Sequence, residues 1–260
     1  MAATVQSHKG QRVILTAGAS GIGRVTAEAF LAAGAKVFVC DIDVVALEQA
    51  LADQPKLAGT KADVAEEADI AALFKAALKH LGGLDILVSN AGAAGPTALV
   101  EDISLEDWRR CVAVNLDSAF LCAKHAAPIL KKQGSGCIIN LSSSAGLFGF
   151  PRRAPYCSAK WAIRGFTKTL AQELGPFGVR CNCICPGAVE GPRIDGVIKR
   201  EAEKSGRSLN EVRDQYASQS SLKTFISPHD IANAILFLTS PAGARINGQE
   251  VAVDGHTETL

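Results

Sequence analysis

The sequence predicts an α/β protein whose core is a doubly wound, seven-stranded parallel sheet flanked by helices. Short apolar runs alternate with helical segments along the whole chain, which is typical of βαβ units. A glycine-rich turn, TAGASGIG at 16–23, joins the first apolar run to the first helical segment. Hydrophobic residues make up 48% of the chain and aromatic residues only 5%, which suits a sheet interior filled with Ala, Val, Ile and Leu.

The length of 260 residues suits one large α/β domain or two small ones. The sequence contains no repeat, low-complexity tract or linker, so we expect a single domain over residues 1–260. A formal net charge of +1 speaks against a nucleic-acid partner, which requires a surplus of Lys and Arg. Residues 1–10 are polar, unlike a secretory signal, and no stretch approaches the roughly 18 apolar residues of a membrane span. We therefore expect a cytoplasmic protein without a membrane partner.

Seven apolar runs predict the strands. Most are rich in branched or small apolar residues, such as RVILT, KVFVCD and GCIINL, which suits strands buried on both faces. The third run is weaker than the others. In order, the strands are expected at 12–16, 36–41, 57–62, 84–89, 136–141, 179–185 and 249–253. Because helical segments separate these runs, the strands should pair in parallel.

Segments with helical spacing predict the helices, at 22–33, 43–53, 66–81, 104–132, 154–174 and 228–238. Gly34 and Gly82 stop the first and third of them, and Pro55 follows the second. Ser104 starts a capping box, and Pro228 occupies the first turn of the last helix. The polar segment 187–227 interrupts the alternation between two core strands, and we expect it to form a lid over the substrate.

The eight cysteines include no CxxC pair, so we expect free thiols in a reducing compartment. Cys181, Cys183 and Cys185 alternate and would share one face of a strand. A soft-metal cluster is one interpretation of that face. Three small buried residues are the favoured one, since free cysteine packs as a compact hydrophobe. We expect no metal site.

The glycine-rich turn lies between a strand and a helix, where such a turn cradles a pyrophosphate. Glycines let the backbone approach the phosphates, and the helix N-terminus adds amide donors and partial positive charge. The sequence therefore predicts a dinucleotide site that uses Gly18, Ser20, Gly21, Ile22 and Gly23.

Asp41 ends the second predicted strand, where a carboxylate would bind the adenosine ribose and repel a 2′-phosphate. Neither Ser20 nor Ile42 is a basic residue that would attract that phosphate. Asp41 could instead be only a cap at the start of a loop. The pattern favours NAD over NADP.

Tyr156 and Lys160 are four residues apart and would share one face of a helix. A nearby ammonium lowers the pKa of a tyrosine, and such a phenol can exchange a proton with a substrate oxygen. Ser143 lies at the end of a predicted strand, where open parallel sheets bind ligands. A Tyr and a Lys at this spacing often occur by chance, so the interpretation depends on Ser143 and the glycine turn together.

With these features the sequence resembles the short-chain dehydrogenases/reductases in their single-domain form of about 250 residues, which have a Rossmann fold. The resemblance covers residues 12–255. Its landmarks, specific as a set, are the turn at 16–23, Asp41, Asp63-Val64, Asn90-Ala91-Gly92, Asn115, Ser143, Tyr156 with Lys160, Pro186-Gly187 and Asp254-Gly255.

The resemblance implies roles for four catalytic residues. Tyr156 would be the general acid/base, and Lys160 would lower its pKa and hold the nicotinamide ribose. Ser143 would hydrogen-bond the substrate oxygen. Asn115 would anchor a water in the proton relay, although taken alone it could be a polar residue inside a helix.

The resemblance also implies contacts to the cofactor and an assembly. Asp63 and Val64 would lie at the adenine, and Asn90, Ala91 and Gly92 would line the cofactor; Pro186, Gly187 and Val189 would face the nicotinamide. Members of the family usually form tetramers or dimers, so we expect a homotetramer or homodimer.

Two residues depart from the family pattern. Ala17 stands where the family places its first glycine, and alanine tolerates a positive φ poorly, so the turn could be reshaped. Gly191 stands near the place of a threonine that contacts the carboxamide, which puts that contact in doubt. Arg193 or a backbone group could substitute for it.

Phe150, Arg152, Arg153 and Arg193 are the candidate substrate-binding residues. Arginines grip carboxylate, sulfonate or phosphate through paired donors, although these three could be surface or interface residues instead. We expect an NAD-dependent oxidoreductase acting on a secondary alcohol or sugar hemiacetal, with sugars, acidic sugars and polyols as first substrates. The alternatives are an NADPH-dependent ketone or 3-oxoacyl-thioester reductase and a non-catalytic nucleotide-binding protein.

Overall fold

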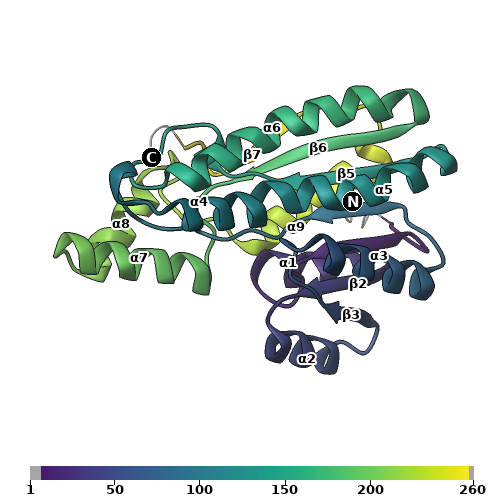
Figure 1. Ribbon diagram of the computed structural model, residues 1–260, viewed down its shortest axis with the longest axis horizontal. Helices are drawn as coiled ribbons and strands as arrows, with labels where there is room; N and C mark the ends of the chain where they lie inside the picture. Colours follow the sequence, from purple (N-terminus) through teal and green to yellow (C-terminus); the bar gives the residue numbers. More distant parts are fainter. Residues whose placement is uncertain (1–6, 258–260) are drawn as a thin grey trace, which may run out of the picture.

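One sheet of seven parallel strands forms the centre of the protein, which a computed structural model describes for residues 7–257 (Figure 1). The strands are β1 (Arg12–Thr16), β2 (Lys36–Asp41), β3 (Leu57–Lys61), β4 (Ile86–Ser89), β5 (Gly136–Leu141), β6 (Val179–Pro186) and β7 (Glu250–Val253). Their order is β3-β2-β1-β4-β5-β6-β7, so the chain winds outward twice from the middle of the sheet. This confirms the predicted doubly wound fold. β3 and β4 are one and two residues shorter than predicted.

Helices cover both faces of the sheet. They are α1 (Gly21–Ala32), α2 (Val44–Asp53), α3 (Glu67–Leu81), α4 (Leu105–Val112), α5 (Ser118–Gln133), α6 (Ala154–Leu174), α7 (Pro192–Ser205), α8 (Leu209–Ser218) and α9 (Pro228–Thr239). Successive side chains of a strand point to opposite faces. Ile14 of β1 therefore joins the core beneath α3, α5 and α6, whereas its neighbours Val13 and Leu15 pack with Phe30 of α1 and Ile235 of α9.

The helix predicted at 104–132 is present, but it is not α-helical throughout, and this difference concerns the site directly. α4 ends at Val112, and a wider π-helical turn, η2 (Ala113–Asp117), precedes α5. The side-chain amide of Asn115 donates to the carbonyl of Cys111 at 2.9 Å. That carbonyl is the one to which the backbone N–H of residue 115 would donate in an α-helix, so the side chain competes for it and the turn widens.

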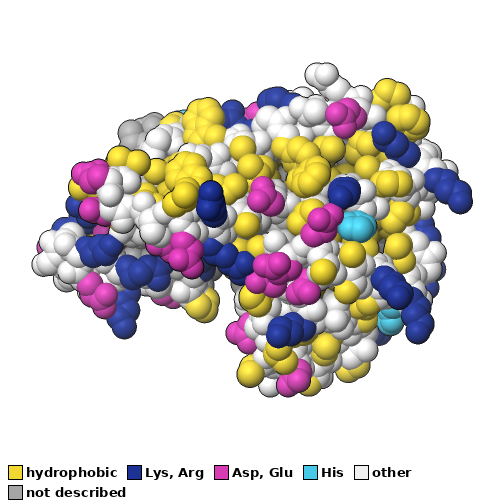
Figure 2. Space-filling model, viewed as in Figure 1, with side chains coloured by type: hydrophobic (Ala, Val, Ile, Leu, Met, Phe, Trp, Pro, Cys, Tyr) yellow, Lys and Arg dark blue, Asp and Glu magenta, His cyan; other side chains and the backbone are white. Residues whose placement is uncertain are grey.

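The segment 187–227 forms a small lobe made of α7 and α8 (Figure 1, left). The lobe has its own apolar cluster, which includes Val197, Val212 and Tyr216. Backbone hydrogen bonds between Glu190 and Ile226 and between Ile226 and Ala188 tie its two ends together. Figure 2 shows charges of both signs on this lobe and an indentation of the molecular outline between the lobe and the part that carries α2.

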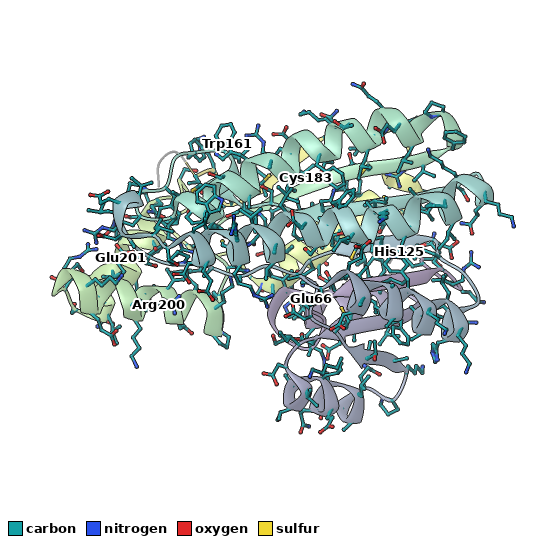
Figure 3. The ribbon with its side chains drawn as sticks, viewed as in Figure 1. Glu66, His125, Trp161, Cys183, Arg200 and Glu201 are labelled. Carbon is teal, nitrogen blue, oxygen red and sulfur yellow. The ribbon has the colours of Figure 1, made fainter. Side chains whose placement is uncertain are left out.

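The alternating cysteines of β6, Cys181, Cys183 and Cys185, are fully buried in the apolar core. Figure 3 places Cys183 on the strand that runs beneath α6. Over the residues that the structure describes, no helix combines the length and the apolar character needed to cross a membrane.

Candidate active site

A cavity of about 270 Å³ lies at the carboxyl ends of the central strands, between the glycine turn and the α7–α8 lobe. Its lining brings together residues that are far apart in the sequence. The predicted site residues among them are Ser20, Gly21, Ile22, Gly23, Asn90, Gly92, Ser143, Phe150, Arg153, Tyr156, Lys160, Pro186, Gly187, Val189 and Arg193. Ligands of doubly wound proteins bind at this edge of the sheet, where the strand order reverses.

The glycine turn is held tightly against the sheet. The side-chain amide of Asn90 donates to the carbonyls of Thr16 and Ala17, both at 3.0 Å. A Cβ on Gly23 would lie 2.0 Å from the Ala17 oxygen, so only glycine fits there. Ala17 itself has a φ of 52°, in the left-handed region. The alanine thus keeps a conformation that glycine adopts more easily, at a cost of roughly 1–2 kcal/mol.

Four predicted cofactor residues lie at or just beyond the ends of β2 and β3 and do not line the cavity: Asp41, Ile42, Asp63 and Val64. The Asp41 carboxylate accepts hydrogen bonds from the backbone N–H groups of Ala19 (3.0 Å) and Asp43 (3.1 Å). It therefore braces the glycine turn, while each oxygen keeps a lone pair for a further donor.

Asp63 accepts a hydrogen bond from Arg110 of α4 at 2.8 Å. Burial alone would raise the pKa of Asp63, but hydrogen bonds from Arg110 and from the backbone of Ala65 lower that pKa overall. Asp63 is therefore a carboxylate fixed beside α4.

Two further predicted cofactor residues, Gly18 and Ala91, also lie outside the cavity lining. A Cβ on Gly18 would lie 2.4 Å from a methyl carbon of Val39.

Tyr156 and Lys160 lie one turn apart on α6, and Ser143 lies at the end of β5. The Lys160 ammonium is 5.7 Å from the centre of the Tyr156 ring and donates to the carbonyl of Leu141 at 2.8 Å. Lys160 is only 2% exposed. The hydroxyl of Ser142 donates to the backbone carbonyl of Lys160 at 2.7 Å, which ties α6 to the end of β5.

Several positive charges act on the Tyr156 hydroxyl. Burial raises the pKa of Tyr156, but Arg193, Lys160 and Arg153, together with a hydrogen bond from Ser143, lower that pKa overall. Burial also lowers the pKa of Lys160, and the nearby Tyr156 opposes this. A phenol with a lowered pKa is suited to general acid–base work near neutral pH.

Asn115 reaches this group from the π-helical turn. Its side-chain nitrogen donates to the carbonyls of Ala93 and Cys111, both at 2.9 Å. Its side-chain oxygen is buried and has no hydrogen-bond partner among residues 7–257. A Cβ on Gly92 would lie 2.9 Å from that oxygen and 3.3 Å from the Lys160 ammonium, so Gly92 keeps this space open.

Two of the three predicted substrate arginines line the cavity. Arg193 at the start of α7 donates to the Tyr156 hydroxyl at 3.4 Å, and Arg153 lies 5.3 Å from the Tyr156 ring centre. Arg153 is 4% exposed and donates to the carbonyl of Ala94 at 2.7 Å. Arg152 is exposed and lies outside this cavity, in a second one. Phe150 lines both cavities.

Sequence reasoning missed several residues of the lobe and its hinge that line the cavity, among them Glu190, Tyr216 and Gln219. Of these residues, only Tyr216 could have been recognised from the sequence, because it is an aromatic residue in an otherwise polar segment. Gly191 has a φ of 130° immediately before α7 and lines the cavity near Arg193. Gly187 lies very close to Asp254, because a Cβ added to Gly187 would be 2.8 Å from the Asp254 Cα. This contact joins the end of β6 to the end of β7.

These residues fit a dinucleotide. The amino end of α1 opens into the cavity, and Gly21 and Gly23 leave the backbone uncovered there, as pyrophosphate binding requires. The unpartnered Asn115 oxygen and the Lys160 ammonium face the space kept open by Gly92. The site can thus hold a nucleotide cofactor beside a phenol that exchanges protons.

Comparison with known proteins agrees with this geometry. A family model described as enoyl-(acyl carrier protein) reductase matches residues 16–256. The 2,5-dichloro-2,5-cyclohexadiene-1,4-diol dehydrogenase of Sphingobium indicum is 34% identical over 248 residues, which cover 95% of this chain and 96% of that protein. The D-beta-hydroxybutyrate dehydrogenase of Rhizobium meliloti is 34% identical over 249 residues, 93% of this chain and 96% of that protein.

Among solved structures, a variant actinorhodin polyketide ketoreductase with NADPH superposes with a TM-score of 0.91 at 29% identity, covering 96% of this chain and 98% of that one. The matches extend over nearly the whole chain. The chain belongs to the short-chain dehydrogenase/reductase family and is an oxidoreductase that acts on alcohol or ketone groups with a nicotinamide cofactor.

Proposed function

We propose that this protein is an NAD-dependent dehydrogenase of a secondary alcohol, or sugar hemiacetal, that carries an anionic group. One observation carries the anionic part of the proposal. Arg193 contacts the Tyr156 hydroxyl and Arg153 lies over the Tyr156 ring, and within residues 7–257 neither arginine forms an ion pair with a carboxylate. A buried arginine is costly to leave uncompensated, so a ligand carboxylate is its natural partner.

Tyr156 is the general acid/base of the proposed reaction. When bound, the nicotinamide ring supplies the acceptor or donor of the hydride. As the alcohol is oxidised, the Tyr156 phenolate accepts its hydroxyl proton, and Ser143 orients the substrate oxygen by a hydrogen bond. Lys160 favours the phenolate through its charge, and the uncommitted Asn115 oxygen is placed to hold a water that passes the proton on.

Asp41 supports NAD as the cofactor. Its carboxylate is fixed by two backbone donors at the end of β2, beside the glycine turn. A 2′-phosphate brought to that position would meet a negative charge. Gly18, Ser20, Gly21, Ile22 and Gly23 would hold the pyrophosphate. Asp63 and Val64 would contact the adenine, and Asn90, Ala91, Gly92, Pro186, Gly187 and Val189 would line the nicotinamide half.

A second candidate function is an NADPH-dependent reductase of ketones or 3-oxoacyl thioesters. The observation that favours it is the similarity to a ketoreductase whose structure was solved with NADPH. The hydroxybutyrate relative favours the dehydrogenase instead, because hydroxybutyrate joins a secondary alcohol to a carboxylate. The charge of Asp41 favours the NAD-dependent dehydrogenase.

An absorbance screen at 340 nm tests the proposed function. The enzyme is mixed with NAD or NADP and with sugars, acidic sugars, polyols and hydroxy acids, each acid beside its neutral amide or alcohol. We expect NADH formation with at least one acid, at a kcat/KM at least about tenfold above that of its neutral counterpart. A preference for neutral substrates would contradict the anionic part, and a preference for NADP would contradict the choice of cofactor.

The assembly and the compartment are further proposals. Phe120 of α5 and Trp161 of α6 are 49% and 48% exposed, and Figure 3 shows Trp161 on the outer side of its helix. We expect these faces to pair in a homotetramer or homodimer, which size-exclusion chromatography with light scattering would detect. The free and mostly buried thiols support a reducing cytoplasm.

A further inference from the structure

A second cavity of about 190 Å³ lies next to the main one. Phe150, Arg153, Tyr216 and Gln219 line both, so these four side chains form the boundary between the two spaces. The far wall comes from elements that the proposed reaction does not use, the loop after β4 and the outer half of α7. The second cavity therefore extends the catalytic one away from the sheet.

The wall of this second cavity carries more positive than negative charge. Arg152, Arg153 and Lys204 line it, against the single carboxylate of Glu201. That carboxylate is already engaged, since one oxygen accepts from Arg207 at 3.0 Å and the other from the Tyr216 hydroxyl at 2.9 Å. Two residues of the α7–α8 lobe thus already bind the Glu201 carboxylate, and Glu201 does not compensate the positive charges of Arg152, Arg153 and Lys204.

None of the three cations has an ion-pair partner in the part of the chain that the structure describes. The Lys204 ammonium donates to the backbone carbonyl of Thr97, which carries no charge. Arg153 donates one nitrogen to the carbonyl of Ala94. Figure 3 shows Glu201 together with Arg200 on α7, so one more cation lies on the same helix.

Two buried polar atoms at this cavity lack a hydrogen-bond partner within residues 7–257. They are the Nε of Arg153, whose side chain is 4% exposed, and the hydroxyl oxygen of Thr97. A buried donor without an acceptor costs roughly 1–3 kcal/mol. A ligand with acceptor oxygens and negative charge would satisfy both atoms and the cations around them.

We propose that the second cavity is a distal subsite for a carboxylate of the substrate, so that the preferred substrate carries two anionic groups. One group lies between Arg153 and Arg193 beside the reacting carbon, and the other lies between Arg152 and Lys204. This inference rests on the proposed function, because it extends the same substrate. Apart from Lys160, which acts on Tyr156, the two cavities hold four cations, Arg152, Arg153, Arg193 and Lys204, against the carboxylates of Glu190 and Glu201. That balance suits a dianion.

The test compares pairs of ligands that differ by one charge. Malonate, succinate, glutarate and adipate, each beside its monomethyl ester, are titrated by calorimetry into the full-length enzyme saturated with NADH. We expect at least one diacid to bind about tenfold or more tightly than its ester, because the second carboxylate gains charge-assisted hydrogen bonds. Equal affinities for every pair would overturn the distal subsite.

Variants locate the second carboxylate. Lys204→Gln keeps a donor for the Thr97 carbonyl but removes the charge, so the advantage of the diacid should fall to about that of its ester while the affinity of the ester stays unchanged. Arg152→Asn should act in the same direction, and asparagine tolerates the φ of 64° at that position. Lys199→Gln removes the same charge from α7 at a position that lines neither cavity, and should change nothing.

Loss of the advantage in Lys199→Gln as well would show a general charge effect and overturn the subsite. Arg193→Ala tests the proposed function separately, because it should weaken the diacid and the ester alike. If it weakens neither, the anion contact beside Tyr156 is wrong, while the ratio of diacid to ester still reports on the second cavity.

Discussion

The guanidinium of Arg193 lies 3.4 Å from the hydroxyl oxygen of Tyr156 and donates a hydrogen bond to it. Arg193 lies in the first turn of α7, so the lobe brings a positive charge to the hydroxyl of Tyr156, the proposed general acid/base. Burial has the largest effect on the pKa of Tyr156 and raises it. The positive charge of Arg193 has the second largest effect and lowers that pKa. In the proposed mechanism, the lobe therefore tunes the acid/base group as well as lining the substrate cavity.

The pH dependence of oxidation should change when this charge is removed. Oxidation needs the Tyr156 phenolate, so activity rises with pH through the pKa of Tyr156. In Arg193→Gln that pKa should rise, and the acidic limb of the pH profile of kcat should move to higher pH. At pH 7 we expect kcat/KM to fall about tenfold, as for one lost charge-assisted hydrogen bond. A profile that keeps its position, as in the control Lys199→Gln, would disprove the coupling.

The preference between the two cofactors should depend on the charge of Asp41. Asp41→Asn keeps an oxygen that accepts from the backbone N–H of Ala19 but removes the negative charge. The kcat/KM with NAD, divided by the kcat/KM with NADP, should therefore fall about tenfold or more. Asp43→Asn, two residues later at the start of α2, removes an equal charge and is the matched control. If the ratio is the same in wild type and Asp41→Asn, the cofactor assignment has no support.

Replacing Ala17 by glycine should stabilise the protein. At a φ of 52° alanine is strained by roughly 1–2 kcal/mol, and glycine loses part of that gain through greater freedom of the unfolded chain. The free energy of unfolding measured in urea should rise by about 0.5–1 kcal/mol. Ala19→Gly should lower it, since Ala19 is buried and its φ is not positive. A less stable Ala17→Gly would mean that the alanine methyl makes a contact worth more than the strain.

The sequence predicted the parts of this structure that depend on local patterns. Short apolar runs such as Val13–Leu15, followed by turn residues, indicate strands buried on both faces, and the glycine turn needs the strand and helix around it. The π-helical turn at Asn115 could not be predicted, because it results from competition between its side-chain amide and a backbone N–H for the Cys111 carbonyl.

The burial of Arg153 likewise could not be predicted from its neighbours in the sequence. It depends on the lobe, whose Tyr216 packs near Phe150 across the boundary of the two cavities. The sequence indicated an arginine near the site but not that it would lack a carboxylate partner. Long-range packing of the α7–α8 lobe against the rest of the domain, rather than sequence spacing, determines which charges a substrate would meet.

The central claim is that Tyr156 exchanges the substrate proton in an NAD-linked oxidation, and Tyr156→Phe tests it most directly. The ring still packs against Arg153, so the cavity should keep its shape. Turnover of the best substrate should fall by about 10²–10⁴-fold, while NADH titrated into the variant binds with nearly unchanged affinity. A variant that binds NADH and keeps wild-type turnover would contradict the account.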